Sequence, residues 1–184
     1  MSGPLLVNGL ILPWRGVTPR LGRNVFVAPN ATIIGDVEIG DDSGIWFGCV
    51  LRGDVHDIRI GQRCNIQDGT IIHVNATGPG TWIGDDVTIG HAAIIHACRL
   101  ETHAFVGMGA IVMDGAVVEG GALVAAGALV SPGKRVPRGE LWAGNPARKM
   151  RDLSEAEIAF LPDTARRYVE YAAEYRMKGE RDRH

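Results

Sequence analysis

The chain has 184 residues, and 19 basic against 21 acidic side chains give it a net charge of −2. This length suits one domain with a sizeable core, and the lack of a basic stripe argues against nucleic acid or an anionic membrane surface as a partner. No apolar stretch approaches the roughly 20 residues of a membrane-spanning helix, and the first residues lack the charged start of a secretory signal. Three widely spaced cysteines without a CxxC pair suit reduced thiols, so we expect a cytoplasmic protein.

Residues 1–20 form a lead-in that contains three prolines and a turn-prone Asn8–Gly9 step. From Val27 onward an apolar residue recurs every six positions, with three slips in phase. The series consists of Val27, Ile33, Ile39, Ile45 and Leu51; Ile60, Ile66 and Ile72; Ile83, Ile89 and Ile95; and Val106, Val112, Val118, Val124, Val130 and Val136. A six-residue period fits neither an α-helix nor a long alternating strand. It is typical of a hexapeptide β-helix, in which three units make one triangular coil, so the sequence predicts an all-β solenoid.

The first two slips in the series mark two excursions from the solenoid. One lies at residues 55–59, and the other is the Thr77–Gly80 segment that follows His73. Loops on a rigid scaffold are a common place for functional groups. The stretch from Gly115 to Val136 is almost pure repeat, and we interpret it as scaffold.

The repeat ends after Val136, and the chain then changes character. Ser154 and Glu157 form a capping box, which predicts a helix start. Pro162 predicts a break, so we expect a short helix near residues 155–161 and a longer one near 163–177. We therefore divide the chain into a β-helix with its lead-in at 1–148 and a helical segment at 149–184 that packs on the β-helix.

Three of the six histidines, His73, His91 and His96, lie in apolar repeat segments. Three imidazoles suit a catalytic zinc site, because the fourth position of the metal must stay open. The gap of 18 residues between His73 and His91 equals one nominal coil, although an excursion lies between them. The other three histidines, His56, His103 and His184, are expected to have no special role.

Polar residues accompany these histidines in two clusters. Arg52 and Asp54 are two positions apart and so share one face of a strand, and Asn65 and Gln67 have the same spacing, with Asp68 next in sequence. Charges in a packed solenoid need partners. We expect Arg52 and Asp54 to form an ion pair between coils or between subunits. This pair either has a structural role only or also orients the metal ligands.

The segments LRGD, NIQDGTIIHV, TIGHAAIIHAC, VGMGA and GNPAR, in this order, resemble the γ-class carbonic anhydrase family, and more narrowly its short bacterial branch. The resemblance covers roughly residues 10–178. It implies a left-handed parallel β-helix with a C-terminal helix and a homotrimer with C3 symmetry. The implied activity is the reversible hydration of CO2 to bicarbonate by a metal-bound hydroxide, with Zn²⁺ as the metal and Fe²⁺ or Co²⁺ as alternatives.

The resemblance also implies roles for individual residues. The metal ligands would be His73 and His96 from one chain and His91 from its neighbour. The residues near the metal would be Gln67 and Asn65, which would face the metal-bound water, and Tyr168, which comes from the helix. The interface residues would be Arg52 and Asp54, as an ion pair, and Asp68.

The chain departs from the family pattern at two places that concern proton transfer. Val55 stands where well-characterised members carry a glutamate, and a short excursion at Ala76–Gly80 replaces the acidic loop. Slow turnover is therefore expected, with His56 or Asp57 as substitute relays. Two alternatives remain open at this stage: a hexapeptide acyltransferase or acyl-CoA thioesterase, and a metal-binding structural protein without significant catalysis.

Overall fold

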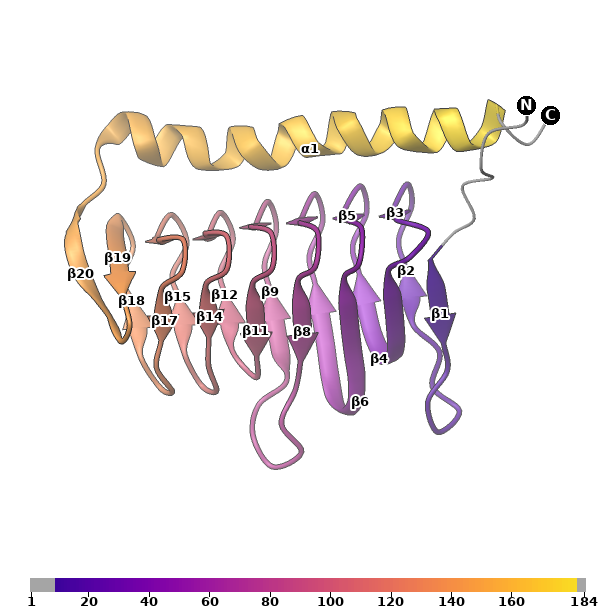
Figure 1. Cartoon of the computed structure of the whole chain (residues 1–184), viewed down its shortest axis with the longest axis horizontal. Coiled ribbons are helices and arrows are strands. Elements are labelled where there is room, and N and C mark those ends of the chain that lie inside the picture. The colour runs from indigo at the N-terminus through magenta and orange to yellow at the C-terminus, as the bar shows by residue number, and fades with distance from the viewer. Residues whose placement is uncertain (1–8, 182–184) are drawn as a thin grey trace.

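The computed structural model describes residues 9–181 and shows a left-handed parallel β-helix with one long helix along its side (Figure 1). Eight strands form one sheet: β3 (Phe26–Val27), β5 (Gly44–Ile45), β7 (Asn65–Ile66), β10 (Thr88–Ile89), β13 (Phe105–Val106), β16 (Leu123–Val124), β19 (Glu140–Gly144) and β20 (Ala147–Asp152). Neighbouring coils are in register, since Ile45, Ile66, Ile89 and Val106 pair in turn. The predicted fold class is confirmed.

The remaining strands form a second sheet that supplies the other two faces of the prism. They are β1 (Leu10–Leu12), β2 (Arg20–Leu21), β4 (Thr32–Ile39), β6 (Val50–Ile60), β8 (Ile71–His73), β9 (Thr81–Ile83), β11 (Ile94–His96), β12 (Arg99–Leu100), β14 (Ile111–Val112), β15 (Val117–Val118), β17 (Leu129–Val130) and β18 (Arg135–Val136). The long strand β6 pairs with both β8 and β9 and so joins two columns of short strands.

The core consists of the predicted six-residue series. Every residue of that series is buried, and none is more than 7% exposed. The three cysteines also lie in this interior as free thiols, and burial raises the pKa of each to about 12. They act as small apolar side chains that fill the core.

Both predicted excursions are present. The loop between β8 and β9 and the bend within β6 project from the edge of the prism that faces away from the helix (Figure 1). Gly53, in the bend of β6, lies against the backbone of β4, and a Cβ there would approach the carbonyl oxygen of Asp36 to 2.5 Å. This close contact explains the glycine at the start of the bend.

The C-terminal segment differs from prediction in one respect. A single helix, α1 (Glu155–Arg181), runs through Pro162, so the predicted break is wrong. Leu161 and Ala165, on either side of the proline, are at most 3% exposed. Their packing outweighs the cost of about 3 kcal/mol for a proline within a helix. The capping box is formed, with Ser154 N donating to Glu157 Oε2 at 2.9 Å.

The boundary predicted at residue 148 falls inside β20, which pairs antiparallel with β19 and closes the last coil. The division into two parts stays a prediction. No helix within residues 9–181 is long and apolar enough to cross a bilayer. Asn8 and His184 lie outside the described residues.

Helix α1 covers the eight-stranded sheet and contacts β3, β5, β7 and β10. Ala165 and Ala172 on its inner face are fully buried. Aromatic rings fill the seam between helix and sheet: Trp46 packs against Tyr168 with ring centroids 5.4 Å apart and against Tyr175 at 5.5 Å. The helix is therefore an integral layer of the fold.

Candidate metal centre

The structure brings two of the three predicted ligands together. Strands β8 and β11 are parallel neighbours that end at His73 and His96, and these residues are register partners. His73 Nδ1 lies 3.2 Å from His96 Nε2. The coil between them contains 23 residues, because the excursion after β8 adds to the nominal 18. His91 therefore does not stack on His73, despite the 18-residue gap.

Asp54, which is paired with Arg52, contacts Nε2 of His73, whereas Nδ1 of that ring is the nitrogen near His96. His73 Nε2 contacts Asp54 Oδ1 at 3.1 Å, and Arg52 Nη1 donates to Asp54 Oδ2 at 2.5 Å. Burial raises the pKa of the Asp54 carboxyl, but the hydrogen bonds from Arg52 and His73 outweigh it, so the pKa lies below its ordinary value. Asp54 is consequently an anion that accepts a hydrogen bond from Nε2 of His73. The predicted Arg52–Asp54 pair exists within one chain.

His96 has a matching carboxylate that the sequence analysis did not identify. His96 Nδ1 contacts Asp114 Oδ1 at 2.6 Å, and Asn75 Nδ2 donates to Asp114 Oδ2 at 2.7 Å. The hydrogen bond from Asn75 is the largest effect on the pKa of Asp114, which is lowered although burial opposes it. Asp114 follows His96 by 18 residues, which is one coil. This spacing could have identified Asp114 as the neighbour of His96.

These contacts determine which ring nitrogens are available. His73 Nε2 and His96 Nδ1 each donate to a carboxylate, so a neutral ring carries its lone pair on the opposite nitrogen. The two lone pairs, on His73 Nδ1 and His96 Nε2, then face each other across 3.2 Å. Two such acceptors repel unless a proton or a cation lies between them. Their chemistry therefore fits a cation such as Zn²⁺, with carboxylates behind both imidazoles.

His91 lies on a different edge of the prism. The corner that precedes β11 holds His91, whose Nδ1 contacts Asp68 Oδ2 at 2.8 Å. This contact leaves Nε2 of His91 as its free acceptor. Within residues 9–181 of one chain, no three potential ligands gather around a common point. One chain thus presents a two-histidine cluster and, separately, a His91–Asp68 pair.

Two other predicted site residues lie on the side of the His91–Asp68 pair. Gln67 adjoins Asp68 at the same corner and is 7% exposed. Tyr168 on α1 is half-buried, and burial, followed by the nearby charge of Asp68, raises the pKa of its hydroxyl. Tyr168 also packs on Trp46, so it serves the helix seam as well.

Asn65 lies in β7, three residues before Asp68. It pairs in register with Gly44 and Thr88, on the sheet that α1 covers, and is 1% exposed. Neither of its side-chain atoms has a hydrogen-bond partner among the described residues. Its predicted role toward a metal-bound water stays a prediction, and its burial beneath α1 favours a packing role.

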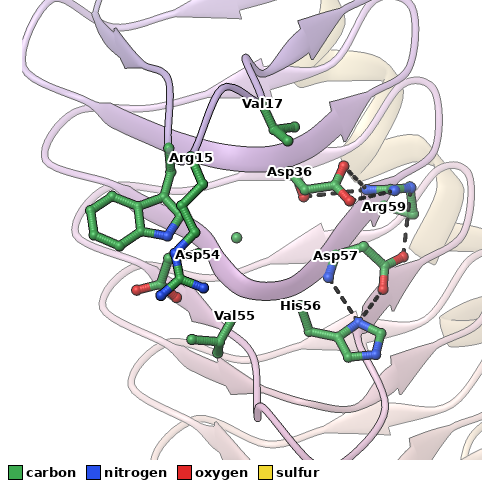
Figure 2. Close-up of a pocket in the computed structure, with 10 residues that line it drawn as sticks. Arg15, Val17, Asp36, Asp54, Val55, His56, Asp57 and Arg59 are labelled. Atoms are coloured by element: carbon green, nitrogen blue, oxygen red, sulfur yellow. Dashed lines mark hydrogen bonds and ion pairs between the residues drawn. The ribbon is translucent and has the colours of Figure 1, made fainter.

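A hollow of about 440 Å³ adjoins the two-histidine cluster, since Asp54 lines it. Figure 2 shows Asp36 and Asp57 around Arg59 on one side of this hollow, with His56 beside Asp57. His56 Nδ1 contacts Asp57, which is the closest partner of that ring. Val55 at the same bend is 47% exposed and offers no group that can carry a proton.

The comparisons with known proteins agree with these features. A family model described as bacterial transferase hexapeptide (six repeats) matches residues 18–53. Gamma carbonic anhydrase 2 of Arabidopsis thaliana is 52% identical over 160 residues, covering 84% of this chain. A carbonic anhydrase of Geobacillus kaustophilus is 42% identical over 167 residues, covering 91% of each chain. The chain belongs to the γ-class carbonic anhydrase family.

Solved structures agree with the fold of a γ-class family member. A hexapeptide transferase family protein from Anaplasma phagocytophilum superimposes with a TM-score of 0.87 at 49% identity, covering 90% of this chain and 98% of that one. N-acyltransferases such as AntD of Bacillus cereus are 17–20% identical to this chain and share the fold alone. The chain spans 58% of the length of the Arabidopsis relatives.

Proposed function

We propose that this γ-class family member is a metal-dependent carbonic anhydrase that interconverts CO2 and bicarbonate in the cytoplasm. One observation carries the proposal: the facing acceptor nitrogens of His73 and His96, each backed by a carboxylate. The names of the relatives give the chemistry of the proposed reaction.

The proposed site is completed between subunits of a homotrimer. A catalytic zinc takes three protein ligands, and the two-histidine cluster offers two. The third would be His91 of a neighbouring copy, through the nitrogen that Asp68 leaves free. Exposed apolar side chains support a subunit contact there, because Ile71 and Ile94, on the strands of this face, and Met108, at the corner next to His91, are 45%, 37% and 57% exposed.

Each polar residue then has a defined task. Bound Zn²⁺, with Fe²⁺ or Co²⁺ as alternatives, would supply a Lewis acid and a more acidic water. Asp54 and Asp114 hold the imidazoles in the required tautomers, and Arg52 neutralises Asp54. Gln67 would orient substrate by hydrogen bonding, and Tyr168 would border the site near Asp68. Because Val55 cannot relay a proton, we propose that turnover is slow and depends on buffer.

The test is metal content together with stopped-flow CO2 hydration, on zinc-loaded and metal-free protein. Close to one zinc per chain with zinc-dependent hydration is expected. His73→Ala, His91→Ala and His96→Ala should each lose the metal while the β-helix stays folded. His103→Asn is the matched control, since His103 is exposed and its Nε2 lies 3.7 Å from Asp86 Oδ2, apart from the three predicted ligands.

Other outcomes have distinct meanings. Zinc without hydration would replace the enzyme by a metal-binding structural protein. A chain that binds no metal would refute the three-histidine site. Retention of zinc by one alanine variant would remove that residue from the ligand set.

A further inference from the structure

The excursion between β8 and β9 is tied to both members of the two-histidine cluster. Thr81 Oγ1, where the chain returns, donates to the carbonyl oxygen of His73 at 2.6 Å. Near the start of the loop, Asn75 donates to Asp114, whose other carboxylate oxygen contacts His96. The loop therefore reaches His73 through the backbone and His96 through two side chains.

The loop itself fixes the orientation of Asn75. Asn75 Oδ1 accepts hydrogen bonds from Thr77 N at 3.1 Å and from Thr77 Oγ1 at 3.2 Å. The amide oxygen is thus committed within the loop, and the NH2 group is left to face Asp114. Gly80 closes the loop against β6, where a Cβ would overlap the carbonyl and carboxylate oxygens of Asp57.

We propose that Asn75 and Asp114 form a positioning relay that sets the ring orientation and tautomer of His96 for metal binding. This inference rests on the proposed function. A carboxylate with one hydrogen bond can rotate, whereas Asp114 is held at one oxygen by Asn75 and at the other by His96. The fixed carboxylate keeps the proton on His96 Nδ1 and keeps Nε2 as the metal-facing acceptor. The short excursion thus has a function in positioning a ligand.

The experiment measures the zinc affinity of the metal-stripped full chain by competition with a chromophoric chelator. Asn75→Ala should weaken binding about 10- to 100-fold, and Asp114→Asn should do the same. The double variant should lose little more than either single variant, because the two residues act in series. Gln62→Ala is the matched control: Gln62 Nε2 donates to Asp85 Oδ2 at 3.3 Å on another edge of the prism, and its loss should leave affinity unchanged.

A second measurement does not depend on metal. Nitrogen-15 NMR of the metal-free chain should show His96 with its proton on Nδ1, and a mixture of tautomers in Asn75→Ala. An unchanged affinity or an unchanged tautomer in a folded Asn75→Ala variant would overturn the relay. If Asn75→Ala does not fold, Thr77→Ala takes its place, because it removes one hydrogen bond to Asn75 Oδ1. This variant should show a smaller loss of zinc affinity and a smaller change in the His96 tautomer ratio. If the wild-type chain binds no zinc, the proposed function is refuted. The tautomer of His96 measured by NMR would then be the test of the relay.

Discussion

Replacement of Asn65 by valine is expected to stabilise the protein, although most substitutions of buried residues do the opposite. Asn65 is 1% exposed beneath α1, and neither its Nδ2 nor its Oδ1 has a partner among the described residues. A buried amide without hydrogen bonds costs about 1–3 kcal/mol, and valine favours a β-strand. Asn65→Val should therefore raise the free energy of unfolding by about 1–3 kcal/mol.

The assay is equilibrium unfolding in urea at one fixed protomer concentration, because the stability of an oligomer depends on concentration. Two threonine-to-valine variants serve as references for the measured changes in unfolding free energy. Thr88→Val removes a buried hydroxyl that has no hydrogen-bond partner within residues 9–181, and it should stabilise the protein by about 1 kcal/mol. Thr70→Val removes an equally buried hydroxyl that donates to the Gly90 carbonyl at 3.1 Å and should destabilise by about 1 kcal/mol.

The result that refutes this reasoning is a loss of 1 kcal/mol or more in Asn65→Val. Asn65 would then make hydrogen bonds in the native protein, as a residue facing a metal-bound water does. Slower CO2 hydration at unchanged zinc content would point to the same conclusion. The experiment therefore separates a packing role from a catalytic one.

Two further predictions concern charges outside the core. The hydrogen bonds of Arg151, and then those of Ser154, lower the pKa of Glu157 from 4.5 to about 2. The ionised carboxylate therefore stabilises the start of α1 above pH 4.5, and this contribution fades as the pH falls toward 2. Glu157→Gln should be less stable than wild type at pH 7, and the two unfolding curves should converge near pH 2; a constant difference would contradict the assignment. Arg52→Ala leaves Asp54 without its cation and should loosen the proposed trimer, and unchanged sedimentation would argue against an interface role for this pair.

The interior of this fold was predictable because one kind of residue recurs at one spacing. Each inward position of the six-residue series is apolar, and its neighbours turn outward. The series can therefore be recognised again after each of its three slips. Pro162 was misjudged because a local rule ignores tertiary contacts. The proline has a fixed local cost, whereas the benefit of continuing the helix comes from a sheet far away in sequence.

The candidate site was only partly predictable for a related reason. The sequence shows which residues can bind a metal. It does not show which of them lie side by side in neighbouring coils, because that depends on how many residues the excursion after His73 adds to the coil. Counting 18 residues from His73 leads to His91, whereas the family resemblance puts His73 and His96 on one chain, and His96, 23 residues on, is the register partner of His73 in the structure. Asp114 was missed because it directly precedes the stretch interpreted as scaffold, which begins at Gly115, although 18 residues separate it from His96 in an uninterrupted coil.

The placement of the histidines also bears on stoichiometry. His91 lies at the corner before strand β11 and His96 ends that strand, so they lie at two different edges of one face. In the proposed trimer, one edge of each chain meets the other edge of the next, which is a head-to-tail contact. Such a contact in an open pair of chains would complete one site and leave two half-sites unused. Only the closed ring gives as many sites as chains. A zinc content of one per chain would therefore report ring closure as well as ligand identity, and a content of one per two chains would indicate an open dimer.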